Sequence, residues 1–125
     1  MAVNYDTATK TARLNTTVTQ IDNHANPATL EICTAAFASV LAIITLADPS
    51  FTVSGAVMTM AGTPKSGVAS ATGTAAVARI KDGGGVVKVN NLTVGTSGQE
   101  INLDSVSITS GQTVTITSGT ITHAT

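Results

Sequence analysis

Near the start of the chain an apolar residue recurs every three or four positions, which is the period of an α-helix. The recurring positions are Leu14, Val18, Ile21 and Ala25. Asn4 or Asp6 can accept hydrogen bonds from the first free backbone amides, and Pro27 opposes continuation of the helix. We therefore expect a helix from about Asp6 to His24, which would be roughly 28 Å long.

The many Thr residues of this segment lower its helix propensity, so the helix needs a surface to pack against. Its apolar stripe, Leu14, Val18 and Ile21, can lie on the sheet of the same chain or on a neighbouring molecule, and packing within the chain is the more frequent case. These three residues are the candidate packing or oligomer contacts. Asp at any of them should destabilise the fold or dissociate an oligomer, because it would bury an unpaired charge.

From Thr29 onward the helical period gives way to short apolar runs separated by turn residues, which predicts β-strands. Leu30 and Ile32 stand at alternate positions of the first run. The run from Val40 to Leu46 is apolar at almost every position, which predicts a strand buried on both faces. Residues 47–50 then form a predicted turn.

A second long apolar run extends from Phe51 to Ala61, with Gly55 as a candidate bulge or close backbone approach, and we interpret this part of the chain as a hairpin. Small residues fill the segment from Ala69 to Ile80, so we expect it to lie close to another backbone. A sharp turn is predicted at Asp82 to Gly85, followed by a strand at Val86 to Val89. Further short runs are Leu92 to Val94, Ile101 with Leu103, Val106 with Ile108, and Val114 with Ile116.

The tail contains a near repeat, because Ile108 to Gly111 and Ile116 to Gly119 have the same sequence, ITSG. A period of eight residues is too short for a solenoid, so we interpret each copy as strand, Gly turn, strand. Between Thr113 and Thr117 the Thr residues alternate with Val and Ile, which predicts one buried face and one face of hydroxyls. An uncharged hydroxyl face suits lateral contact with another protein, although an ordinary solvent face is more frequent.

Composition supports the β assignment, because 45 of the 125 residues are Thr, Val or Ile. We expect a single structural domain that is mainly β with an N-terminal α-helix. Residues 1–27 form the helical segment and residues 28–125 form a compact antiparallel β-sandwich or barrel. The chain has no Trp, and its only large aromatic residues are Tyr5, Phe37 and Phe51. Because a core of small aliphatic side chains buries little apolar area per residue, we expect additional burial through symmetric self-association.

Several partners and locations are disfavoured by charge and hydropathy. Six Lys and Arg against seven Asp and Glu give a net charge of -1, so nucleic acid is a poor partner. The longest apolar stretch, Val40 to Leu46, is far shorter than the ~20 residues that cross a bilayer, and Met1 to Lys10 does not resemble a secretory signal. We expect a soluble protein without a membrane partner, in which Cys33 is a buried structural thiol.

Residues that could carry catalysis or bind a metal are scattered along the chain. Only Glu100 and Asp104 are carboxylates close in sequence, His24 is expected at the end of the helix, and His123 belongs to the tail. There is no GxSxG motif, and the glycines of Asp82 to Gly85 lack the spacing of a phosphate-binding loop. We therefore expect no catalytic, cofactor-binding or metal-binding residue, and no enzyme.

Three phrases carry a resemblance to a known group of proteins: TLEICTAAFASVLAIITLADPSFTVSGAVMTMAGTP, SGVASATGTAAVARIKDGGG and LTVGTSGQEINLDSVSITSGQTVTITSGTITH. The chain resembles the small Thr-, Ala- and Gly-rich virion proteins of tailed bacteriophages, and among them the capsid decoration or cement proteins. The resemblance implies a protein made in the host bacterial cytoplasm that binds the outer capsid surface of the virion. There it would contact the major capsid protein as a trimer or dimer and stabilise the shell.

Two other functions stay open at this stage. The chain could be a tail, baseplate or head-fibre component whose helix forms a stalk or anchor, and copy number per particle would separate this role from a shell protein. It could also be a host-surface or glycan-binding module, which would need a cleft with converging polar groups. The N-terminal helix departs from the all-β form of several decoration proteins.

Overall fold

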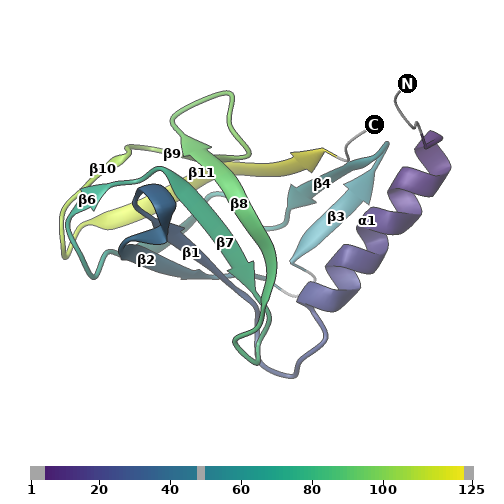
Figure 1. Cartoon of the computed structure of the whole chain (residues 1–125), viewed down its shortest axis with the longest axis horizontal. Helices are drawn as coiled ribbons and strands as arrows, with labels where there is room; N and C mark the ends of the chain where they lie inside the picture. Colours follow the sequence, from purple (N-terminus) through teal and green to yellow (C-terminus); the bar gives the residue numbers. More distant parts are fainter. Residues whose placement is uncertain (1–4, 48–49, 123–125) are drawn as a thin grey trace.

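The computed structural model describes residues 5–47 and 50–122, and the chain folds into a curled sheet with one helix at its N-terminal end (Figure 1). The predicted residues Asn4, Asp48, Pro49 and His123 lie outside this description. The helices are α1 (Thr7–Ile21) and the short 3-10 helix η1 (Ala35–Phe37). The strands are β1 (Thr29–Cys33), β2 (Val40–Thr45), β3 (Phe51–Ser54), β4 (Val57–Met60), β5 (Lys65–Val68), β6 (Gly73–Thr74), β7 (Val77–Lys81), β8 (Val87–Gly95), β9 (Ile101–Leu103), β10 (Ser107–Ile108) and β11 (Thr113–Thr122).

Most strands belong to one sheet, in the order β2-β1-β7-β8-β9-β11-β4-β3, with β5 also paired to β11. Every pair in it is antiparallel except β8 with β9, which is parallel. The sheet curls until the segment after β5 reaches β2, where the Ser70 N–H donates to the Leu41 carbonyl at 2.8 Å. The fold class predicted from the sequence is therefore confirmed: the protein is mainly β with an N-terminal helix, and its sheet is barrel-like.

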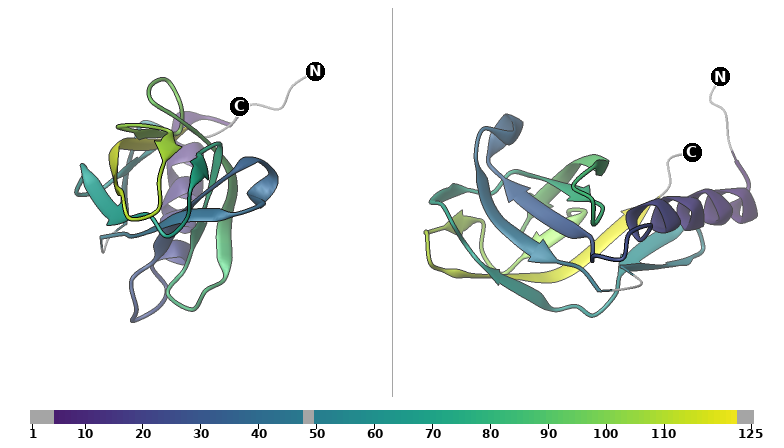
Figure 2. Two further views of the ribbon diagram at one scale, coloured as in Figure 1. Left: turned by 90° about the vertical axis from the view of Figure 1, so that its left-hand side faces the viewer. Right: turned by 90° about the horizontal axis from the view of Figure 1, so that it is seen from below.

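The long strand β11 connects the curled sheet to the helix. Its first residues pair with β5, its middle pairs with β9, and Thr120–Thr122 pair with β4. The β3–β4 hairpin therefore extends the sheet beyond its curled part, and α1 lies along this extension (Figures 1 and 2). Two hydrogen bonds join the helix to the hairpin: Ser50 N–H donates to Asp22 Oδ2 at 3.0 Å, and Ala56 N–H donates to Thr11 Oγ1 at 3.2 Å.

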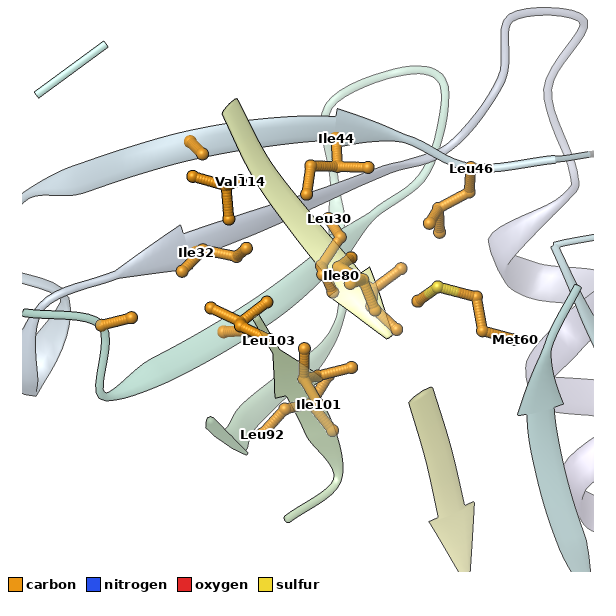
Figure 3. Packing of buried hydrophobic residues seen from close by; sticks show 14 of the residues in the cluster. Leu30, Ile32, Ile44, Leu46, Met60, Ile80, Leu92, Ile101, Leu103 and Val114 are labelled. Carbon is orange, nitrogen blue, oxygen red and sulfur yellow. The ribbon is translucent and has the colours of Figure 1, made fainter. Parts of the chain in front are cut away.

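Small aliphatic side chains build the core, as the composition predicted, and among residues 5–47 and 50–122 Phe51 is the only aromatic side chain buried in it. Side chains from β1, β2, β7, β8, β9 and β11 converge inside the curl (Figure 3). Leu14 and Ile21 of α1 belong to the same cluster. The helical segment and the strands thus share one continuous core.

The helix is shorter at its C-terminal end than the sequence predicted. Asp6 is the N-cap, and its Oδ1 accepts from the Thr9 N–H at 2.7 Å. The helix ends at Ile21 because Asp22 leaves helical geometry and turns its carboxylate toward Ser50 of the hairpin. The predicted positions of His24 and Ala25 on the helix are therefore wrong, and both residues are exposed in the following loop.

The prediction that the run from Val40 to Leu46 is buried on both faces is also wrong. In β2 the side chain of Ile43 is 52% exposed and Thr45 is exposed, because pairing with Glu31 and Thr29 of β1 places both on the side of the sheet away from the core. In β1, by contrast, the residues on both faces of the strand are buried, so buried and exposed residues do not alternate. Glu31 and Cys33 are buried although they face away from the core, where η1 follows β1 and lies against β7.

Glycines account for two further corrections. Gly55 is neither a bulge nor a close approach: it forms, with Ala56, the two-residue turn between β3 and β4, and both residues have positive φ (57° and 67°). In the tail, Gly111 is a turn residue with φ 87°, as predicted, but Gly119 lies inside β11 and is buried. The second ITSG copy is therefore continuous strand, because β9 pairs with residues of the copy itself and β4 pairs with the residues that follow it.

Candidate protein-binding face

The described part of the chain, residues 5–47 and 50–122, contains no pocket and no group of three His, Cys, Asp or Glu side chains that could hold a metal ion. Within the same residues, no helix has the length and apolar character required to cross a membrane.

The helical stripe proposed from the sequence lies against the protein's own sheet. Ile21 is fully buried, Leu14 is 5% exposed, and Val18 packs against the core while partly exposed. Their neighbours are strands β3, β4 and β8. Packing within the chain occupies these residues, and Leu14 and Ile21 have almost no surface left for a second molecule.

The two carboxylates that are close in sequence, Glu100 and Asp104, each accept hydrogen bonds from a residue of a neighbouring strand. Glu100 Oε1 accepts from the backbone N–H of Thr93 at 3.0 Å and from its hydroxyl at 3.1 Å. Asp104 Oδ1 accepts from the Thr115 N–H at 3.3 Å. Each carboxylate thus satisfies a neighbouring strand residue. His24 lies against the β7–β8 turn, where a Cβ added to Gly84 would come within 2.6 Å of its Nε2 atom.

A compact group of charged side chains lies on the outer side of β1 and β7. Glu31 Oε1 is 2.6 Å from Arg79 Nε, and Glu31 Oε2 is 3.0 Å from Lys81 Nζ. Register explains the group, because Glu31 stands opposite Arg79 and Thr29 stands opposite Lys81, so the two cations flank the carboxylate. The Glu31 side chain is 9% exposed, whereas those of Arg79 and Lys81 are each 25% exposed.

The cations keep Glu31 ionised in spite of its burial. Burial raises the pKa of Glu31, but the hydrogen bonds and charges of Lys81 and Arg79 act in the opposite direction and leave the pKa below its ordinary value. On the same outer side of the sheet, burial raises the pKa of the Cys33 thiol, and the charge of Arg79 partly offsets this rise. Cys33 is thus a buried free thiol, as the sequence predicted.

Phe37 covers one side of this group through an unusual backbone conformation. Ala36 and Phe37 have φ of 58° and 57°, a left-handed conformation that costs a residue with a Cβ about 1–2 kcal/mol. This conformation places the Phe37 ring against the guanidinium of Arg79, whose Cζ is 5.1 Å from the ring centroid. The contact is a cation–π interaction and restrains the Arg79 side chain.

Two exposed aliphatic side chains complete the surface. Ile43 of β2 stands opposite Glu31 and is 52% exposed, and Val87 of β8 stands opposite Lys81 and is 40% exposed. Cross-strand partners share one face of a sheet, so both residues border the charged group. We call this surface the β1–β7 face, and it consists of Glu31, Phe37, Ile43, Arg79, Lys81 and Val87.

Sequence reasoning missed the β1–β7 face. One signal was present, because Arg79 and Lys81 are separated by one residue and must project from the same side of a strand. Their neighbour Glu31 is 48 positions from Arg79 in the chain, and only the strand pairing brings the two together. Ile43 was expected to be buried.

A second surface carries hydroxyl groups. At the end of the sheet, Thr52, Thr59 and Thr120 stand in one cross-strand row on the side opposite to the row of Val53, Met58 and Ile121. In the first half of β11 the predicted alternation is confirmed, because Val114 and Ile116 are fully buried while Thr113 and Thr117 are exposed.

Comparison of the chain with protein-family models, with curated proteins and with solved structures finds no match. The fold is that of a small, mainly β domain with an N-terminal helix.

Proposed function

We propose that this chain is a structural protein of a bacteriophage virion, most like a capsid decoration protein that binds the outer capsid surface and stabilises the shell. Its partners are the major capsid protein and other copies of itself, as a homotrimer or homodimer. The observation that carries the proposal is the β1–β7 face, where an arginine, an aromatic ring and two exposed aliphatic side chains lie together. Arg and aromatic residues are enriched at protein–protein contacts and among their energetically dominant positions.

Weak individual contacts suffice for such a protein. A homo-oligomer engages several identical coat subunits at once, so the second and third contacts form at a high effective concentration. The short Thr, Ser and Val side chains that cover much of the exposed sheet lose little rotamer entropy when they are immobilised. Both properties favour reinforcement of a repeating lattice.

The proposal is tested with capsids of the phage or prophage that encodes the chain. Purified protein is mixed with expanded capsids that lack it, the capsids are sedimented, and bound protein is measured. We expect saturable binding at one fixed ratio to the coat subunit, and greater resistance of the decorated shell to heat. Capsids of an unrelated phage serve as the control and should bind none.

Microscopy of the intact virion gives the deciding outcomes. Copies arranged over the whole head at fixed lattice positions, in the hundreds, agree with a decoration protein. A few copies confined to the tail, the baseplate or a head fibre would contradict the proposal and favour a tail or fibre role. Absence of the chain from finished virions would remove every virion role.

A further inference from the structure

We propose that the β1–β7 face is the surface that docks on the capsid, and that Arg79 binds a carboxylate of the major capsid protein there. This inference rests on the proposed function and names the site and the chemistry of its partner. The occupant is a coat-protein segment in which an Asp or Glu stands next to apolar side chains.

Arg79 uses only part of its hydrogen-bonding capacity within the described residues. Its Nε donates to Glu31, but its two terminal nitrogens make no hydrogen bond to any residue within 5–47 or 50–122. A guanidinium presents its donors in a planar fork that matches both oxygens of a carboxylate. A quarter of the Arg79 side chain is exposed, so this free side can be reached from solvent.

The β1–β7 face carries a net positive charge. Arg79 and Lys81 against Glu31 leave the face with a charge of +1, whereas the whole chain carries -1. The face is therefore a positive region on an otherwise negative protein, and it is complementary to an acidic group. Two copies of this face carry the same sign of charge, which disfavours pairing of the face with itself across a symmetric dimer.

Arg79 is also preorganised. Glu31 holds Arg79 from one side and the Phe37 ring holds it from another, so little rotamer freedom is left to lose on binding. Two consecutive left-handed residues, Ala36 and Phe37, maintain the ring position at an energetic cost. Strain of this kind persists only where the surrounding structure imposes it, and it is concentrated at functional surfaces.

The apolar border indicates a protein partner. Ile43 on β2 and Val87 on β8 are separated by the two strands β1 and β7, so they lie roughly 14 Å apart across the sheet. Apolar side chains around a central charged contact exclude water from it, and this is the arrangement of energetically dominant contacts between proteins. A phosphate backbone would make no use of this border.

The test compares variants for binding to the same expanded capsids. Ile43→Asp places a carboxylate at an exposed border position, where it repels an acidic partner without removing a buried side chain. Thr52→Asp introduces the same group at an exposed strand position of the β3–β4 hairpin and is the matched control. Arg79→Lys keeps a positive charge beside Glu31 but removes the fork. Melting temperature and mass by light scattering are measured for each variant.

We expect Ile43→Asp to weaken capsid binding by at least about tenfold and Arg79→Lys by about fivefold, while Thr52→Asp binds like the wild type. Equal binding by all four proteins would overturn the inference but leave the proposed function intact. Failure of the wild type to bind would remove the proposed function and the capsid as occupant. A change of oligomeric mass in Ile43→Asp with unchanged capsid binding would show that a second copy occupies the face.

Discussion

The junction between α1 and the β3–β4 hairpin permits a quantitative test of how the helix contributes to stability. Ile21 lies in the last turn of α1, is fully buried, and precedes the Asp22 carboxylate that accepts from Ser50. Ile21→Ala removes three buried carbons, which corresponds to roughly 2.4 kcal/mol of transfer free energy. A cavity left by partial relaxation raises the expected loss to about 3–4 kcal/mol. That is a large part of the ~5–15 kcal/mol typical of a domain.

Denaturant unfolding followed by far-ultraviolet circular dichroism measures this loss, since the chain has no Trp for fluorescence. Val18→Ala should cost about 1 kcal/mol, because this side chain is only partly buried. Thr19→Ala is the control: its hydroxyl bonds only to the Asn15 carbonyl on the exposed side of the helix, and the free energy of unfolding should change by less than about 0.5 kcal/mol. A loss below about 1 kcal/mol for Ile21→Ala, with an unchanged denaturant slope, would refute the view that the helix is part of the core.

The pKa of Glu31 is lowered in the folded protein, so the unfolded chain binds more protons on acidification. The melting temperature should therefore stay level from pH 7 to about 5 and fall toward pH 3, and the fall should be less steep in Glu31→Gln. A melting temperature that stays level down to about pH 3 would contradict this prediction. Gly111→Asn should lower the free energy of unfolding by less than about 1 kcal/mol, because Asn tolerates positive φ. Gly119→Asn should lower it by more than about 2 kcal/mol, because a Cβ there would lie 3.1 Å from Met60 Cε. Equal losses for the two variants would contradict the assignment of Gly111 to a turn and Gly119 to a strand. Cys33 should react with a thiol reagent only on unfolding, and rapid labelling of the native protein would show that it is accessible.

Features that depend on local pattern were predicted from the sequence. The helical period, the acidic N-cap and the glycine-rich turn at Asp82 to Gly85 each act over a few residues, and the structure contains all three. Side-chain alternation likewise identified most strands. The predicted strands at Val86 to Val89 and Leu92 to Val94 proved to be one strand, β8, in which an extra residue near Asn91 interrupts the register with β7.

Features that depend on register and on layers could not be predicted in this way. Ile43 and Ile44 are adjacent and chemically identical, yet one is half exposed and the other is 1% exposed, because strand pairing determines which of them faces the core. The end of α1 likewise depends on a residue that is distant in sequence. Its last turn is set by the Asp22 contact with Ser50, which is 28 residues away in sequence.

The two ITSG copies have the same four residues but different conformations. At Gly111 the chain turns with positive φ, and its N–H donates to the Ala69 carbonyl at 2.8 Å. At Gly119 the same residues continue as strand, with Ile101 as partner and Met60 against the position that a Cβ would fill. The partner strands decide between the two conformations, and the glycine permits both.

Ionised Glu31 is stabilised in the folded protein by its two cations, but stability alone does not require an ion pair at this position. Replacing a buried ion pair by apolar side chains of similar size is often neutral or stabilising, and the core of this protein consists almost entirely of such side chains. What the carboxylate does accomplish is geometric: it holds Arg79 and Lys81 at 2.6 Å and 3.0 Å on the outer side of the sheet. A chain with only six Lys and Arg residues thereby presents two of them in a fixed arrangement between exposed aliphatic side chains. Glu31 is in this sense a positioning residue for the contact that Arg79 is proposed to make.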